Sequence, residues 1–95
     1  NNIGNIITSS TISPTGIWFA TATNGGSISG NTISTLSYTG TSAYAPSGIV
    51  ISSGTTTTAI SVSNNTISGL TSSGTGMTSG IYSNSVNHTI FNNKK

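Results

Sequence analysis

A short pattern, in which an asparagine stands just before an isoleucine, recurs along this chain. It is clearest in residues 62–70 and returns in residues 30–34, with looser copies in residues 4–7 and 87–91. Four copies of one pattern in a chain of 95 residues indicate a repeat architecture, in which each repeat buries its apolar side chains against its neighbours. The repeat therefore constrains the fold more than any other feature of the sequence.

Two further motifs lie between the copies of the first. A glycine followed by an isoleucine occurs at Gly16, Gly48 and Gly80, with 32 residues in both intervals. A third apolar position precedes the later copies of the asparagine motif, at Ile28, Val62 and Val86. Each period thus holds three short strand candidates, and strands this short need to pair with their copies in the next period, at a spacing of about 4.8 Å. The sequence predicts one all-β domain over residues 1–95, a β-solenoid of about three coils.

Successive side chains of a strand point to opposite faces, so the alternation within each motif predicts which residues form the core. Eight apolar residues are expected to face inward: Ile17, Phe19, Ile33, Ile49, Ile51, Ile67, Ile81 and Ile90. The same alternation turns Trp18 and Tyr82 outward, in one column with Val50.

The asparagine of the first motif is expected at a sharp corner between two strands. Asparagine tolerates left-handed backbone angles better than any residue except glycine, and stacked amides can hydrogen-bond to one another along a column. Alignment of the four copies predicts a corner column of Asn5, Asn31, Asn65 and His88, in which the histidine replaces asparagine at the last corner.

Charged side chains are almost absent from this sequence. It contains no Asp and no Glu, and its only Lys or Arg residues are Lys94 and Lys95. Glycoside hydrolysis needs two carboxylates in most families, a Ser-His-Asp arrangement would lack its acid, and calcium would find only carbonyl and amide oxygens. We therefore expect no enzymatic activity, no catalytic residue, no metal site and no cofactor.

The composition also excludes other classes of partner. Two lysines do not form the basic patch that neutralises phosphates, so no nucleic-acid partner is expected. No apolar run approaches the length that crosses a bilayer, so membrane insertion is not expected either. The chain has no Cys, which leaves neither a disulfide framework nor a thiolate metal site.

Residues 80–93 and 62–70 resemble the right-handed parallel β-helix repeats of pectate-lyase-like proteins and bacterial surface adhesins, while residues 1–15 match weakly. The resemblance implies a right-handed parallel β-helix located outside the cell or at its surface. Enzymes of this family use acidic residues, and none of those positions can be carried over to a chain without carboxylates. The fold itself hosts many unrelated functions.

The sequence favours a structural role in an extracellular fibre, stalk or adhesin. No polar cap stands at either end of the repeat, so we expect self-association through the end coils, or pairing with further coils of a longer β-helix. The alternative is a carbohydrate- or surface-binding module that uses Trp18 and Tyr82, helped by Tyr38 and Tyr44, although all four aromatic rings could instead pack under loops. An ice-binding threonine array at residues 55–58 is a further alternative.

Overall fold

Nine β-strands account for all of the regular secondary structure in the described part of the chain, which in this computed structural model comprises residues 1–9, 11–20, 25–52, 60–83 and 89–94. Three strands lie in each repeat: β1 (Asn2–Thr8), β2 (Thr15–Phe19) and β3 (Gly26–Ser29), then β4 (Thr32–Tyr38), β5 (Ser47–Ile51) and β6 (Ile60–Ser63), then β7 (Thr66–Ser72), β8 (Ser79–Ser83) and β9 (Thr89–Phe91). We call these three groups the first, middle and third coil. Within the described ranges no helix is long and apolar enough to cross a membrane.

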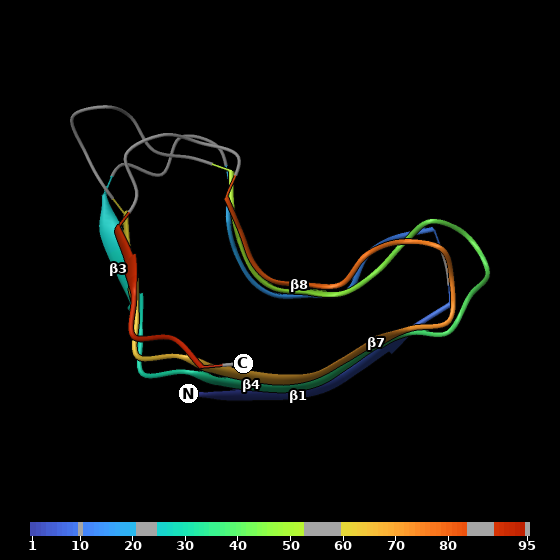
Figure 1. The fold of residues 1–95 in the computed structure, drawn as a ribbon, viewed down its shortest axis with the longest axis horizontal. Coiled ribbons are helices and arrows are strands. Elements are labelled where there is room, and N and C mark those ends of the chain that lie inside the picture. The colour runs from blue at the N-terminus through green and yellow to red at the C-terminus, as the bar shows by residue number, and fades with distance from the viewer. Residues whose placement is uncertain (10, 21–24, 53–59, 84–88, 95) are drawn as a thin grey trace.

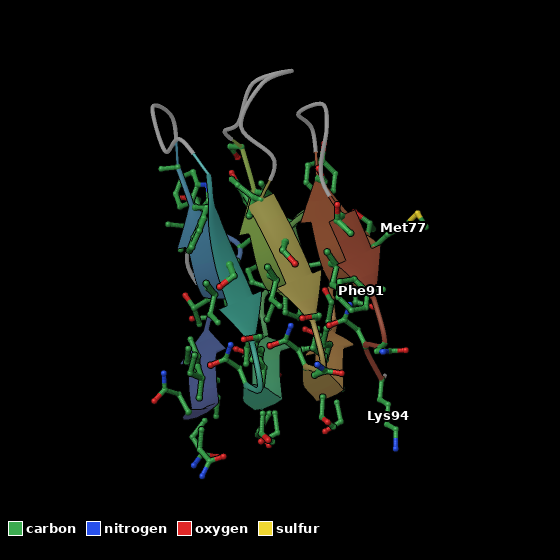
Figure 2. The ribbon with its side chains drawn as sticks, turned by 90° about the vertical axis from the view of Figure 1, so that its left-hand side faces the viewer. Met77, Phe91 and Lys94 are labelled. Carbon is green, nitrogen blue, oxygen red and sulfur yellow. The ribbon has the colours of Figure 1, made fainter. Side chains whose placement is uncertain are left out.

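The strands form three parallel sheets of three strands each, in the orders β1-β4-β7, β2-β5-β8 and β3-β6-β9. Each pass of the chain adds one strand to every sheet, so the three coils overlie one another in Figure 1 and stand side by side in Figure 2. The all-β class and the parallel stacking that the repeat predicts are confirmed, and the arrangement fits a β-solenoid of about three coils.

The glycine-isoleucine motif aligns as its constant spacing predicts. Ile17, Ile49 and Ile81 stand in one column of the β2-β5-β8 sheet. A Cβ atom at Gly48 would lie 2.6 Å from the carbonyl oxygen of Gly80 and 2.8 Å from Cγ2 of Ile67. Glycine recurs in this motif because the backbone of the next coil passes too close for any side chain.

Burial is most complete in the middle of the stack, although Ile28 of the first coil is buried as well. Six side chains of the middle coil have no exposed surface: Ile33, Leu36, Ile49, Ile51, Ile60 and Val62. Of the other residues expected inward, Ile67 is buried, while Ile17, Phe19 and Ile81 are half-buried against the core cluster. Ile90 continues the inward column of Ile28 and Val62, but it is 46% exposed because β9 is an edge strand. Its partner is Val62 and not Ile67, which corrects the alignment of the last repeat.

The molecule is flat along the direction in which its coils stack. It measures 40 × 22 × 16 Å, and Figure 1 views it down the shortest axis, along which the coils overlie one another. The two faces that terminate the stack are therefore large compared with its sides. Any further coil would have to be added on one of these two end faces.

Candidate functional surfaces

A ladder of buried asparagines joins the coils at the corner that leads into the β1-β4-β7 sheet. The backbone N–H and Nδ2 of Asn31 both donate to Oδ1 of Asn65 at 3.0 Å. In the next step the backbone N–H and Nδ2 of Asn65 donate to Oδ1 of Asn93, at 3.1 and 2.9 Å. Asn31 is 8% exposed and Asn65 is 1% exposed, so these hydrogen bonds satisfy polar groups that water does not reach.

The residue before each ladder asparagine makes the corner itself. Gly30, Asn64 and Asn92 have φ angles of 68°, 56° and 55°, in the left-handed region that glycine and asparagine adopt most readily. Left-handed geometry and amide stacking therefore belong to two adjacent residues. The alignment of the motif predicts both properties for one residue, and the structure divides them between two.

One member of the predicted corner column, Asn5, is not where the alignment puts it. Asn5 lies inside β1, level with Thr35 and Gly69, where it shares a left-handed φ with both of them but has no place in the ladder. Its side chain is exposed. His88 lies outside the described residues, and Asn93 occupies the ladder position of the last corner.

Asn1 is the residue of the first coil that corresponds to Asn31. The backbone N–H of Thr32 donates to the carbonyl of Asn1 at 2.8 Å, as that of Thr66 donates to Asn31 and that of Lys94 donates to Asn65. Sequence reasoning missed both Asn1 and Asn93. The signals were an asparagine two residues before Ile3, and an Asn-Asn pair at residues 92–93 that repeats the pair at 64–65.

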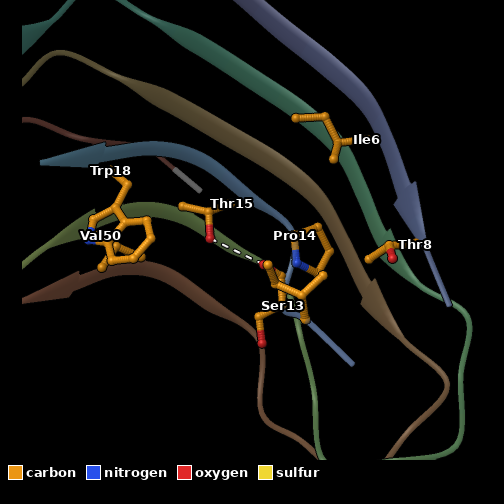
Figure 3. A pocket seen from close by; sticks show the side chains of 8 residues that line it. Ile6, Thr8, Ser13, Pro14, Thr15, Trp18 and Val50 are labelled. Atoms are coloured by element: carbon orange, nitrogen blue, oxygen red, sulfur yellow. Dashed lines mark hydrogen bonds between the residues drawn. The ribbon is translucent and has the colours of Figure 1, made fainter. Parts of the chain in front are cut away.

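The first coil borders a mostly apolar hollow of about 500 Å³. Figure 3 shows its lining, which comes from β1, β2, β5 and the segment before β2: Ile6, Thr8, Ile12, Ser13, Pro14, Thr15, Trp18 and Val50. All of these residues except Val50 belong to the first coil or to its connections. The first coil thus leaves apolar surface unfilled.

The opposite end face carries a smaller hollow of about 230 Å³. It is lined by core isoleucines and by the last described residues of the chain: Ile67, Gly80, Ile81, Asn93 and Lys94. Met77 and Phe91, labelled in Figure 2 with Lys94 beside the third coil, are 89% and 45% exposed. Neither end of the stack has an apolar interior that is closed.

Lys94 adds one backbone bridge to the edge of β7 on this end face. It pairs in parallel with Thr66 as an isolated bridge. Its N–H donates to the carbonyl of Asn65 at 2.8 Å, and its own carbonyl accepts from the N–H of Ile67 at 2.8 Å. Backbone pairing on β7 is therefore started by this residue and is not continued by any other described residue.

The outward column of the β2-β5-β8 sheet has the register that its spacing predicts. Trp18 pairs with Val50, which pairs with Tyr82. Trp18 is 62% exposed and Tyr82 is 49% exposed. The indole Nε1 of Trp18 donates to Oγ of Ser52 at 3.0 Å, which fixes the ring on the outer face of the sheet.

The remaining candidate residues do not join this column. Tyr38 is buried, and its ring meets that of Tyr44 edge to face with centroids 5.7 Å apart, so this pair packs the loop. The threonine array at residues 55–58 lies outside the described residues.

Comparison of the chain with protein-family models, with curated proteins and with solved structures returns no match. The end faces and the outer aromatic column are the surfaces of this molecule from which a function can be inferred.

Proposed function

We propose that this chain is a structural, non-catalytic right-handed parallel β-helix segment of an extracellular fibre, stalk or adhesin, whose end coils pair with further coils. Those coils belong to a second copy or to a longer chain of the same repeat. One observation carries the proposal: Ile49 in the middle coil has no exposed surface, while Ile17 and Ile81, in the same column of the outer coils, are only half-buried. A further coil on each end face would bury them as Ile49 is buried.

The backbone supports the same proposal. The strands of the first and third coils are edge strands, and an edge presents a row of N–H and C=O groups ready to pair with another parallel strand. Native proteins protect such edges with charged side chains, yet among the described residues only Lys94 carries a charged side chain. Electrostatic repulsion between end faces is therefore weak.

Location outside the cell follows from the resemblance of residues 62–70 and 80–93 to the repeats of surface adhesins, and is part of the proposal. A structural role also agrees with the composition, since the chain has no carboxylate side chain with which to catalyse hydrolysis.

The length distribution of the particles tests the proposal directly. We expect electron microscopy at micromolar concentration to show fibres of uniform width, and sedimentation velocity to show their mass rising with concentration. Ile6→Lys, which places a charge at the hollow of the first coil, should abolish the fibres. Ile7→Lys is the matched control, because the side chain of Ile7 is already 62% exposed. Single particles at every concentration would exclude pairing between copies.

A second candidate is the binding of a neutral polysaccharide on the outer column, favoured by the exposed rings of Trp18 and Tyr82 one coil on either side of Val50. Aromatic faces stack on the apolar faces of sugar rings. Trp18→Ala should then abolish retention on an insoluble neutral polysaccharide, whereas Ile7→Ala, which removes an equally exposed side chain outside the column and outside the hollow, should not. Equal retention of both variants would exclude this candidate.

A further inference from the structure

Residues 93–94 occupy the place on β7 where the next coil would begin. Oδ1 of Asn93 accepts two hydrogen bonds from Asn65, and the backbone of Lys94 exchanges one bond with Asn65 and one with Ile67. Asn93 also donates through Nδ2 to the carbonyl of Val62 at 3.1 Å. The polar groups of Asn65 that face the end of the stack are thus fully engaged within the chain.

The first coil opens with residues of the same kind in the same phase. Asn2 pairs with Thr32, as Thr32 pairs with Thr66 and Thr66 pairs with Lys94. Asn1 and Asn2 therefore stand in the first coil where Asn93 and Lys94 stand beyond the third. Figure 1 shows the N and C marks near the same corner of the coil, and Figure 2 places β1 and Lys94 at opposite ends of the stack.

We propose that residues 93–94 occupy the docking place of Asn1 and Asn2 of a second copy, and that copies pair only when this segment leaves β7. The inference rests on the proposed function and identifies its partner as another copy of this chain. Both segments would need the same carbonyl and the same amide of Asn65, and each of these groups is already used by the resident segment. The two segments therefore compete for one place.

The incoming copy gains more from that place than the resident segment does. Within the described residues the resident segment pairs with β7 through one bridge, at Lys94, whereas β1 of a second copy offers seven residues to pair along the edge of β7. In register, Ile3 of the incoming copy would lie over Ile67, as it lies over Ile33 within its own chain, and would cover the hollow beside Ile67 and Ile81. At sufficient protein concentration the incoming copy should therefore displace the resident segment. The strength with which the resident segment pairs with β7 then sets the concentration at which fibres appear.

Weakening the resident segment tests the competition. Lys94→Pro removes the N–H that donates to Asn65 and leaves β7 unchanged, so the concentration at which fibres appear should fall by about tenfold. Lys94→Gln removes the charge but keeps the N–H, and should change that concentration by less than about twofold. Removal of residues 93–95 should act like Lys94→Pro, and circular dichroism checks that each variant keeps its β structure.

A disulfide between two copies tests the register, because the chain has no Cys of its own. In the proposed pairing the Asn2 position of one copy lies beside the Thr66 position of the other, at the separation of paired strands, about 4.8 Å, which a disulfide spans. A mixture of Asn2→Cys and Thr66→Cys chains should give a mixed disulfide, faster when both also carry Lys94→Pro. Asn2→Cys mixed with Ser68→Cys is the control, since Ser68 lies two residues further along the same strand.

The outcomes separate this inference from the function on which it rests. A fall in threshold with Lys94→Pro, together with the 2–66 disulfide, supports the competition. Equal thresholds for the wild type and Lys94→Pro would overturn the competition and leave the fibre role standing, and preference for the 2–68 disulfide would overturn the register. Absence of fibres and of disulfides in every variant would overturn pairing between copies and the inference with it.

Discussion

The middle coil and the two outer coils are built from nearly the same residues but are not equally buried. Ile17, Ile49 and Ile81 are identical in type and lie in one column, yet only Ile49 is fully buried. Because the three residues are of the same type, their different burial comes from their different places in the stack. Each coil completes the core of its neighbours, so the stability of one coil is not a property of that coil alone.

The asparagine ladder shows the same difference for polar groups. Asn65 has an asparagine on either side, whereas Asn93 has one only on the side of Asn65 among the described residues. A ladder position in the middle of the stack is satisfied from both directions. A position at the end depends on whatever coil is added there.

Replacement of the central ladder asparagine should have the largest effect on stability. Asn65→Ala removes the acceptor for two donors of Asn31 and the donor to the carbonyl of Ile28, and so takes three hydrogen bonds from buried groups, although Nδ2 of Asn31 still donates to the carbonyl of Ser29. Because each unsatisfied buried group costs about 1–3 kcal/mol, we expect a loss of about 4 kcal/mol in the free energy of unfolding. Urea denaturation followed by circular dichroism measures it.

The neighbouring asparagine is the matched control for that measurement. Asn64 is exposed and has a φ of 56°, which glycine adopts without strain, so Asn64→Gly should change the free energy of unfolding by less than about 0.5 kcal/mol. Equal losses for the two variants would show that the ladder contributes nothing beyond the turn geometry of its corner.

The isoleucine column offers a direct comparison between coils. Ile49→Ala creates a cavity in a closed core and should cost about 3 kcal/mol. Ile17→Ala and Ile81→Ala remove the same atoms from half-buried places and should cost about 1 kcal/mol each in dilute solution. The three variants are compared by urea denaturation below the concentration at which fibres form.

The same three variants also show whether copies pair. If the end coils become covered in fibres, the losses for the outer variants should approach that for Ile49→Ala, and their fibres should dissociate at higher protein concentration than those of the wild type. Equal losses in dilute solution would contradict the difference in burial from which the functional proposal starts.

At one position of the β1-β4-β7 sheet, the middle coil has the residue that is least suited to a left-handed backbone. Asn5, Thr35 and Gly69 are level in the β1-β4-β7 sheet and have φ angles of 57°, 60° and 67°. A left-handed backbone costs a β-branched residue such as threonine more than asparagine or glycine. Thr35→Gly should therefore raise the free energy of unfolding by about 1 kcal/mol.

The control for this variant lies one coil away. Gly69→Ala puts a Cβ at a φ of 67° and 3.0 Å from the backbone nitrogen of Thr35, and should destabilise the protein. Destabilisation by Thr35→Gly would mean that contacts of the threonine side chain outweigh the strain of its backbone.

The sequence predicts the glycine-isoleucine column well because steric closeness leaves no freedom there. Gly16 and Gly48 both face a carbonyl oxygen of the next coil, and a Cβ atom on either glycine would lie only 2.7 or 2.6 Å from that oxygen. The spacing in sequence therefore has to equal the spacing in structure, and a motif with this constraint aligns by inspection. The strand pairing and the outward column of Trp18 follow from it.

The asparagine motif was predicted only in part because asparagine serves three purposes in this fold. It forms the ladder at Asn31 and Asn65, makes the corner turn at Asn64, and holds a left-handed angle within a strand at Asn5. All three read alike in sequence, since each places an asparagine near an isoleucine. Asn5 was therefore assigned to the ladder in place of Asn1, and Asn93 was overlooked.

The smallest expected effect is that of pH on the free energy of unfolding. The chain has no Asp or Glu and one His, and residues 32–63, which span the middle coil, contain no charged residue. Folding therefore changes the proton binding of few groups, and the free energy of unfolding in dilute solution should vary by less than about 0.5 kcal/mol between about pH 4 and about pH 9. Urea denaturation at several pH values checks this, and a larger change would show that an ionising group is coupled to folding.

Salt should change the concentration at which fibres form but not the free energy of unfolding. Lys94 and Lys95 give each copy a net positive charge that no acidic residue offsets, so screening the repulsion between copies should lower the threshold for fibres by about twofold between low salt and about 1 M salt. Because Lys95 keeps its charge, Lys94→Gln should remove about half of that salt dependence while the free energy of unfolding stays the same. A salt effect of equal size on unfolding and on fibre formation would contradict this expectation, because the middle coil has no charged side chain for salt to screen.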